Sequence, residues 1–511
     1  MKKTVIILML VTIISKILGF ARDITLSYFY GASSISDVYL ISLTIPAIIF
    51  SIVGKGISVG FIPMYTRIEN KSGSQKASLY TNNLLNLLIV ISMVIFLIGI
   101  IFTETIVKLF ASGFEGETLA LTVQFTRISL TSVFFTALIY VYLAFLQVKG
   151  AFIIPAIMGL PANIITIGAI FLSSYTSIYI LTLGIILSSL SQLLLLFIFS
   201  YKHDFRYKFT LDYKDENIRK MAILALPAIV GTSVAQVNLL VDRTLASRIV
   251  KGGITALDYA NTLSVVIIGV FVLSISTVLY PKISKLIAED NIDGMKSVFS
   301  NAINIINILV IPAAIGCMFF AKPVVELLYG RGRFDSDAIE MTSYALFFYS
   351  IGIIGLSHRE NLSNAFYALQ DTKTPMINAG LAMLLNIILN LILSRILGIG
   401  GIALATSIST TFCTFLLIVS LRKRLGKLGL KKLSFSFVKI ITASIVMGGI
   451  SKYFYNILIS KIGIISTFFL SVTLGVLVYI AILHLLKVKE IDMIVLLLKG
   501  KLKKSFAKEA A

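Results

Sequence analysis

Long apolar stretches recur along the chain from one end to the other, separated by short polar or basic segments. Each is about 20 residues or longer, the length that an α-helix needs to cross the hydrocarbon core of a bilayer. The weak alternation over about ten residues that is typical of a transmembrane β-barrel is absent. The pattern therefore predicts an all-α polytopic membrane protein. We expect about fourteen transmembrane helices, at 4–28, 37–64, 79–103, 119–147, 152–173, 178–200, 221–246, 256–280, 298–320, 338–368, 375–396, 400–421, 434–456 and 463–486.

The sequence also contains an internal repeat, with an offset of about 220 residues. Each repeat unit holds an even number of expected helices, so both units cross the membrane in the same direction. This predicts two six-helix lobes in a parallel pseudo-two-fold repeat, with a cavity between them. The matches are Arg22, Gly31 and Asp37 with Arg243, Gly252 and Asp258, the segment 109–115 with 328–335, and Leu146, Gln147 and Asn163 with Leu369, Gln370 and Asn386.

Basic segments and the end of the repeat divide the chain further. We expect an N-lobe at 1–201, a basic cytoplasmic loop at 202–220 and a C-lobe at 221–421. Two additional helices follow at 422–486. The remaining residues, 487–511, carry an apolar stretch between lysines, which predicts an amphipathic tail along the membrane surface.

Composition and charge placement support a membrane protein with both termini in the cytoplasm. Residues are 57% hydrophobic and 14% charged, too apolar for a soluble protein of this length. Most of the 45 Lys and Arg residues fall on the side that carries the N-terminus, and few fall on the opposite side. This asymmetry follows the positive-inside rule. The net charge of +21 therefore indicates cytoplasmic anchoring rather than nucleic-acid binding.

No catalytic or metal-binding motif is present in the sequence. The two cysteines, Cys317 and Cys413, both lie inside apolar stretches, and the three histidines are scattered. No Ser/His/Asp set or aspartate pair for metal-bound sugar nucleotides occurs. We therefore expect a protein that is not an enzyme.

Several charges nevertheless fall within expected helices, where they are costly unless they face a cavity or a partner. Lys16, Arg22 and Asp23 lie in the first helix, and the repeat duplicates Arg22 as Arg243. One interpretation is a cationic cavity for a phosphate-bearing substrate. The alternative is structural ion pairs or side chains that reach to the membrane surface. The candidate substrate-binding residues are Lys16, Arg22, Asp23, Lys55, Arg127 and Arg243.

Oxygen-bearing side chains form a second candidate site. Asn386 and Asn390 share a face of one expected helix, and Thr406 and Asp242 could meet them. One carboxylate with amide and hydroxyl oxygens would suit a small hard cation such as Na⁺. The alternative is ordinary hydrogen bonding between membrane helices. No other cofactor is expected.

Two aspartates, Asp37 and Asp258, stand at the start of expected helices. A carboxylate in this position usually accepts hydrogen bonds from the first backbone N–H groups of its own helix. We therefore expect both residues to be N-caps.

The motifs together resemble the MurJ/MviN lipid II flippase family. The segment 15–23 (SKILGFARD) with Phe29–Tyr30–Gly31–Ala32 and Ser36–Asp37 resembles the opening of that family. Matches continue in the family's order through most of the chain, and together they are specific. They are Leu146–Gln147, Ala246–Ser247, Tyr280–Pro281, 330–334 (GRGRF) and 368–375 (ALQDTKTP).

This resemblance implies the MOP exporter fold, in which two lobes enclose a V-shaped cavity and the last two helices form a groove for a lipid tail. It implies movement of lipid II, an undecaprenyl-diphosphate-linked peptidoglycan precursor, from the inner to the outer leaflet of the bacterial cytoplasmic membrane by alternating access. The expected partners are this substrate and membrane lipids, and we expect a monomer.

Individual positions match the family unevenly. Family cavity positions coincide with Arg22 and Asp23, and by residue type with Lys16. The family's sodium site falls on Asp242, Asn386, Asn390 and Thr406, where Asn390 replaces a familiar aspartate.

Two arginines that are common in the family are missing, because Phe50 and Thr262 stand at their positions. Lys55 and Arg243 compensate in one interpretation. In another, the chain carries a different undecaprenyl-linked saccharide. A MATE-type multidrug antiporter fits less well, since cationic drugs favour acidic cavities. A membrane scaffold would need no buried charges.

Overall fold

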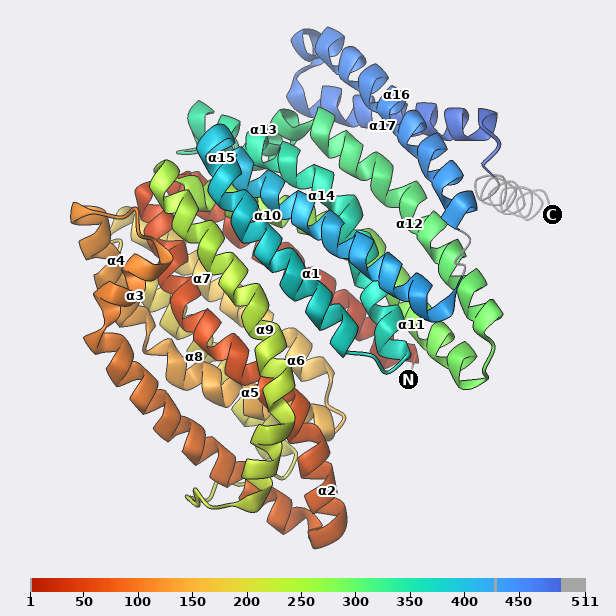
Figure 1. The fold of residues 1–511 in the computed structure, drawn as a ribbon. Coiled ribbons are helices and arrows are strands. Elements are labelled where there is room, and N and C mark those ends of the chain that lie inside the picture. The colour runs from red at the N-terminus through yellow and green to blue at the C-terminus, as the bar shows by residue number, and fades with distance from the viewer. Residues whose placement is uncertain (1, 427–429, 489–511) are drawn as a thin grey trace, which may run out of the picture. The chain divides into compact units, whose positions relative to one another are not determined.

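The computed structural model describes residues 2–426 and 430–488, and this part of the chain is entirely helical apart from its connections (Figure 1). It forms two compact units. The first comprises the described residues up to Thr255 together with Tyr329–Ala338, and the second comprises Ala256–Leu328 and the described residues from Ile339 onward. The expected tail at 487–511 lies outside the described residues from position 489 onward.

The helices of the first unit are α1 (Lys2–Tyr30), α2 (Ser34–Ile101), α3 (Thr103–Phe110), α4 (Gly116–Ser129), α5 (Ser132–Val148), α6 (Ile153–Ile157), α7 (Gly159–Tyr175), α8 (Ile180–Lys202) and α9 (Glu216–Ile249). Helix α10 (Gly253–Ile267) begins in the first unit and continues into the second. The second unit contains a π-helical segment (Ile268–Val272), α11 (Leu273–Ala288), α12 (Ile292–Phe319), α13 (Ala321–Tyr329), α14 (Ser336–Ala368), α15 (Lys373–Leu425), α16 (Leu430–Ile462) and α17 (Ile464–Leu485).

Two of these helices are much longer than one membrane crossing. Helix α2 has 68 residues and is interrupted at Gly73, which has φ 85° and ψ 165°. Helix α15 has 53 residues and is interrupted at Gly398, with φ 57° and ψ −131°. Glycine reaches such left-handed backbone angles without a Cβ clash. Each long element is therefore two helices joined at one glycine. For α2, the sequence had predicted a loop at 65–78 instead.

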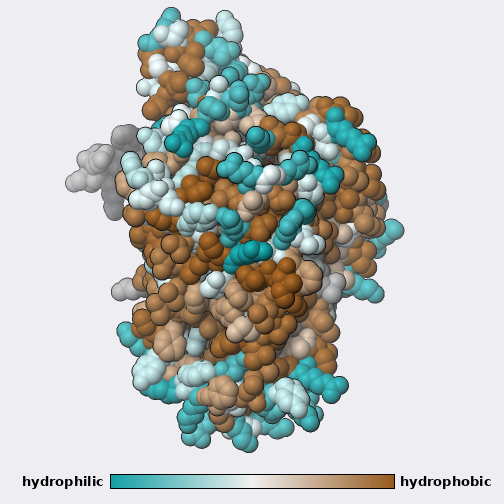
Figure 2. Space-filling view, turned by 90° about the vertical axis from the view of Figure 1, so that its left-hand side faces the viewer, coloured by the Kyte–Doolittle hydropathy of each residue, from teal (hydrophilic) through white to brown (hydrophobic). Residues whose placement is uncertain are grey.

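Within the described residues, nine helices are long and apolar enough to cross a membrane, or eleven if two bent pairs each count as one span. The bent pairs are α4 with α5, at 43°, and the two parts of α9, at 57°. The expected all-α polytopic architecture is confirmed. Figure 2 shows hydrophobic residues over much of the visible face, as a lipid-facing surface requires, with hydrophilic residues both at its lower end and across its upper half.

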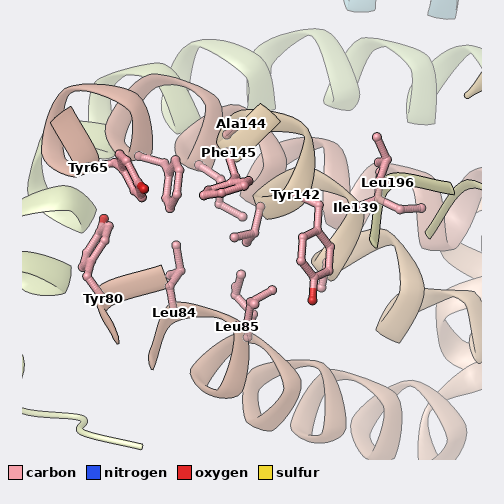
Figure 3. Packing of buried hydrophobic residues seen from close by; sticks show 14 of the residues in the cluster. Tyr65, Tyr80, Leu84, Leu85, Ile139, Tyr142, Ala144, Phe145 and Leu196 are labelled. Carbon is pink, nitrogen blue, oxygen red and sulfur yellow. The ribbon is translucent and has the colours of Figure 1, made fainter. Parts of the chain in front are cut away.

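The core of the first unit is rich in aromatic residues. Tyr65 and Tyr80 of α2 lie near Phe145 of α5 (Figure 3). The ring centroids of Tyr65 and Phe145 are 5.7 Å apart in an edge-on arrangement that aromatic pairs favour. Helices α2 and α5 therefore pack side by side in this core.

Asparagines of α2 attach the 202–220 loop to the first unit. The side-chain amides of Asn82, Asn83 and Asn86 donate to the carbonyl oxygens of Arg206, Asp212 and Thr210, at 2.9–3.0 Å. Because these bonds satisfy backbone groups of an extended segment, the part of the loop between α8 and α9 is held along α2 without secondary structure of its own.

In the second unit, the family-like segment 368–375 has a clear local role. The Asp371 carboxylate accepts hydrogen bonds from the backbone N–H and hydroxyl of Thr374, at 2.9 and 2.8 Å. It also pairs with Arg424, at 2.7 Å. Asp371 thus caps the start of α15 and joins it to the end of the same element.

Helices α16 and α17 pack against each other in the second unit, as Figure 1 shows. The Tyr479 hydroxyl of α17 donates to the carbonyl oxygen of Ile308 on α12, at 2.8 Å. Gly475 lies against the Ser451 hydroxyl of α16. Small residues of this kind let membrane helices approach closely.

Candidate functional site

Arg22 and Asp23 form an ion pair on α1. The guanidinium donates from Nε and Nη2 to the same carboxylate oxygen of Asp23, at 3.0 and 2.7 Å. The Arg22 side chain is 36% exposed and that of Asp23 is 14% exposed. The carboxylate therefore orients the guanidinium while leaving part of it accessible to a ligand.

A cavity of about 160 Å³ adjoins this pair within the first unit. Helices α1, α2, α7 and α8 form its walls, and small residues such as Gly159 and Ala162 keep it open. Its polar lining consists of Arg22, Tyr39, Asn163, Thr166, Ser188 and Gln192. Such a cavity, mostly neutral and polar with one cation, can bind an anionic or uncharged polar group.

The repeat-related arginine, Arg243 of α9, reaches the same part of α2. Its Nη1 donates to the carbonyl oxygen of Leu40, at 3.0 Å. Leu40 follows Tyr39, which lines the cavity with Arg22. The two arginines matched by the repeat therefore converge on adjacent residues of α2.

Asp37 does not cap its own helix, contrary to expectation. Ser33 is the N-cap of α2, in a reciprocal capping box with Ser36. The Asp37 carboxylate instead accepts hydrogen bonds from the backbone N–H groups of Gly252 and Thr255, both at 2.8 Å, and from the Thr255 hydroxyl. Asp37 is 1% exposed, so it serves as a buried cap for the first turn of α10.

Four glycines bring the connecting loops of the first unit together by backbone contact. They form two repeat-related pairs, Gly31 with Gly252 and Gly113 with Gly332. A Cβ at any of them would overlap a backbone carbonyl of another loop or of a helix end. Those carbonyls belong to Arg333, Ala32, Ser247 and Tyr28 respectively. We call this set the glycine closure.

Three other predicted cations lie apart from the cavity lining. Lys16 of α1, Lys55 of α2 and Arg127 of α4 are exposed. None of them is among the residues that line the Arg22 cavity. Their assignment to substrate binding stays a prediction.

The predicted cation ligands of α15 lie together in the second unit. The Asn386 amide donates to Thr406 and Ser409, at 3.3 Å each, and its oxygen accepts from Asn390, at 2.8 Å. Asn386 and Asn390 are buried. Asp242 lies on α9 in the first unit, and its part in this set stays a prediction. Among the described residues, no group of three or more His, Cys, Asp or Glu could hold a metal ion.

One of the two family departures has a clear structural setting. Phe50 is fully buried in the aromatic core of the first unit. A charged side chain at this position would be buried among apolar residues, which is costly without a partner.

A family model described as the lipid II flippase MurJ matches residues 26–473, most of the chain. The chain belongs to the MurJ lipid II flippase family. Members of this family are transporters rather than enzymes.

Curated members of the family align over most of their length. A probable lipid II flippase MurJ of Buchnera aphidicola subsp. Acyrthosiphon pisum is 30% identical, covering 87% of this chain and 88% of the relative. One of Thermotoga maritima is 29% identical, covering 94% and 96%.

Solved structures give the same family and a wider fold relationship. The structure of the lipid II flippase MurJ in an inward closed conformation has a TM-score of 0.82 and 27% identity, covering 94% of this chain and 99% of that one. An inward-facing MATE-family multidrug transporter has a TM-score of 0.71 at 15% identity, covering 83% and 98%. The fold is thus shared with the MATE transporters, and the sequence places the chain in the MurJ family.

The charged part of the site was predictable from the sequence, but its neutral part was not. Arg22 and Asp23 stood out as charges inside an apolar helix. Tyr39, Ser188 and Gln192 did not, because isolated neutral polar residues are common in membrane helices. Their shared cavity becomes apparent only when four helices are packed together.

Proposed function

We propose that this protein carries lipid II from the inner to the outer leaflet of the bacterial cytoplasmic membrane, and that Arg22 holds the substrate diphosphate. Membership in the MurJ family supports the substrate class. The single observation that carries the binding site is the Arg22–Asp23 pair at the polar cavity. A guanidinium oriented in this way can donate paired hydrogen bonds to phosphate oxygens.

The proposed topology has fourteen crossings with both termini in the cytoplasm. The breaks at Gly73 and Gly398 turn α2 and α15 into two crossings each. The pairs α4–α5 and α10–α11 and the bent α9 supply one crossing each. The helices α1, α7, α8, α12, α14, α16 and α17 supply the rest. Because this topology places the basic segments in the cytoplasm, the glycine closure lies at the outer face of the membrane.

Transport would then proceed by alternating access. The glycine closure and the Asp37 cap of α10 would hold the outer side shut while the headgroup enters from the cytoplasm. Release to the outer leaflet requires these contacts to part. We propose that α16 and α17 form the groove for the polyprenyl tail, as the resemblance implies, and that the protein acts as a monomer.

We also propose a role for Na⁺ at Asp242, Asn386, Asn390 and Thr406. The buried cluster of amide and hydroxyl groups on α15 supports this proposal, because such oxygens are ligands for small hard cations. Asp242 would supply the formal negative charge.

A second candidate is a flippase for another undecaprenyl-linked saccharide. The buried Phe50 favours it, because this chain lacks a cation that is common in the family at that position. Both candidates share the diphosphate and differ in the sugar.

The test is depletion of the protein in its own host, followed by detection of lipid II that is accessible at the outer leaflet. We expect outer-leaflet lipid II to fall and to recover with the wild-type chain. Unchanged lipid II, with loss of another exposed lipid-linked saccharide, would select the second candidate.

A further inference from the structure

The cavity beside Arg22 contains a polar group whose presence the ion pair with Asp23 does not explain. Tyr39 is 2% exposed, and its hydroxyl has no hydrogen-bond partner among the residues that the structure describes. A buried hydroxyl without a partner is costly, and such groups in native proteins require an explanation. Because Tyr39 lines the cavity, a ligand bound there would supply the partner.

The remaining polar lining is neutral and offers both donors and acceptors. Asn163 donates through its amide nitrogen to the carbonyl oxygen of Ser15, at 3.3 Å, which leaves its side-chain oxygen as an acceptor. The Ser188 and Thr166 hydroxyls donate to carbonyls of their own helices and so present lone pairs to the cavity. The Gln192 side-chain amide can both donate and accept a hydrogen bond. The cavity is therefore matched to an uncharged group that both donates and accepts.

The size of the cavity narrows the choice of ligand. The cavity, at about 160 Å³, is several times the roughly 30 Å³ that one water molecule occupies in the liquid. An acetamido substituent with the adjoining edge of a sugar ring fits this space. A complete disaccharide with its peptide does not, so only one part of the substrate headgroup can enter.

We propose that this cavity is a subsite for the acetamido group of an N-acetylated sugar, and that Tyr39, Asn163 and Gln192 recognise it beside the phosphate bound by Arg22. The inference rests on the proposed function and adds the determinant of sugar selectivity. An acetamide has one N–H donor and one carbonyl acceptor, which the Tyr39 hydroxyl and the two amide side chains can pair.

The decisive variant is Tyr39→Phe, because it removes only the unpartnered hydroxyl and keeps the aromatic ring. Tyr455→Phe is the matched control. Tyr455 of α16, in the second unit, is 3% exposed and its hydroxyl is also without a partner. Both variants should fold at least as well as the wild type, since each removes an unsatisfied buried polar group.

Binding is measured by native mass spectrometry of the full chain with three probes. These are lipid II, undecaprenyl diphosphate without a sugar, and undecaprenyl-diphosphate-linked glucose, which lacks the acetamido group. We expect Tyr39→Phe and Gln192→Leu to weaken lipid II binding about three- to tenfold, the range of one or two lost hydrogen bonds. Binding of the other two probes should not change, and Tyr455→Phe should change none.

The outcomes separate this inference from the proposed function. Undecaprenol, which lacks the diphosphate, serves as the reference lipid, and wild-type chain that binds none of the three probes better than undecaprenol would overturn both. Lipid II binding that is equally tight in the wild type, Tyr39→Phe and Gln192→Leu would overturn the acetamido subsite alone. An equal loss for all three probes would also overturn it, because the cavity would then act on the diphosphate.

Discussion

The carboxylate of Asp37 accepts a hydrogen bond from the backbone N–H of Gly252, 215 residues away, at 2.8 Å. The same carboxylate receives the backbone N–H and hydroxyl of Thr255. One buried side chain thus ties the beginning of α2 to the first turn of α10. Under the proposed topology, this link holds the outer side of the protein closed.

Replacing Asp37 by alanine should loosen that link. The change leaves two buried backbone N–H groups without acceptors, at a cost of about 1–3 kcal/mol each. We expect faster amide hydrogen exchange at Gly252 and Thr255. Thr255→Val, which removes only the hydroxyl, should have a smaller effect. If Asp37→Ala leaves exchange at both amides as slow as in the wild type, the carboxylate does not maintain the closure.

The glycine closure makes a second prediction, for which the chain offers a close control. Gly252 and Gly73 both have positive φ, 80° and 85°. A Cβ at Gly252 would meet the carbonyl of Ala32, whereas one at Gly73 would meet nothing within 4 Å. Alanine pays the backbone cost of about 1–2 kcal/mol at both positions. We expect Gly252→Ala to lower the thermal midpoint of unfolding clearly more than Gly73→Ala. An equal decrease in both variants would mean that the close contact at Gly252 does not contribute to stability.

The Asp371 cap predicts a pH dependence in the second unit. The backbone N–H of Thr374, with the Thr374 hydroxyl and Arg424, lowers the pKa of Asp371 below its usual value of 3.8. Because the folded-state pKa is the lower one, the stabilisation is complete above about pH 4 and is lost as the pH falls through the folded-state value. The difference in thermal midpoint between the wild type and Asp371→Ala should therefore shrink below pH 4. A difference that stays constant down to pH 3 would contradict the prediction.

Substitutions of Arg22 can distinguish a phosphate-binding role from simple charge balance with Asp23. Lysine keeps the charge but loses the paired donors. If Arg22 binds diphosphate, Arg22→Lys should fail to complement a flippase-depleted cell at normal membrane levels. The double change of Arg22 and Asp23 to alanine should fail as well. Growth of the double variant, but not of the single ones, would instead assign Arg22 to the ion pair alone.

The proposed sodium site predicts that Asp242→Ala reduces any sodium dependence of thermal stability or transport. The change removes the formal negative charge from the proposed ligand set. Asn386→Ala should reduce the same dependence. Equal sodium responses in the wild type and both variants would leave the hydrogen bonds of Asn386 and Asn390 with a structural role only.

The fold class followed from the sequence because apolar stretches of membrane-spanning length are a strong signal. The exact ends of the elements did not follow, and α2 illustrates the reason. Its polar residues around position 70 suggested a loop, yet the chain stays helical except at Gly73. A helix can extend beyond the membrane into water, where polarity no longer distinguishes helix from loop.

Only those residues of the site that stand out from their neighbours in sequence were predicted. Arg22 was found because charge inside an apolar helix is unusual. The partner of Asp37 was not found, since helix capping is inferred from neighbouring residues and Gly252 is remote in sequence. The environment of Tyr39 was hidden for a similar reason. Whether its hydroxyl is satisfied depends on how α1, α2, α7 and α8 pack together.

The glycine closure also affects how the sequence can vary. Its contacts are made by carbonyl oxygens and by the absence of side chains at Gly31, Gly113, Gly252 and Gly332. The identity of many surrounding loop residues is therefore free to change, since the backbone they contribute is the same for all. A saturation mutagenesis map of these loops should show four isolated intolerant positions within permissive stretches, so selection here would preserve empty space rather than any chemical group.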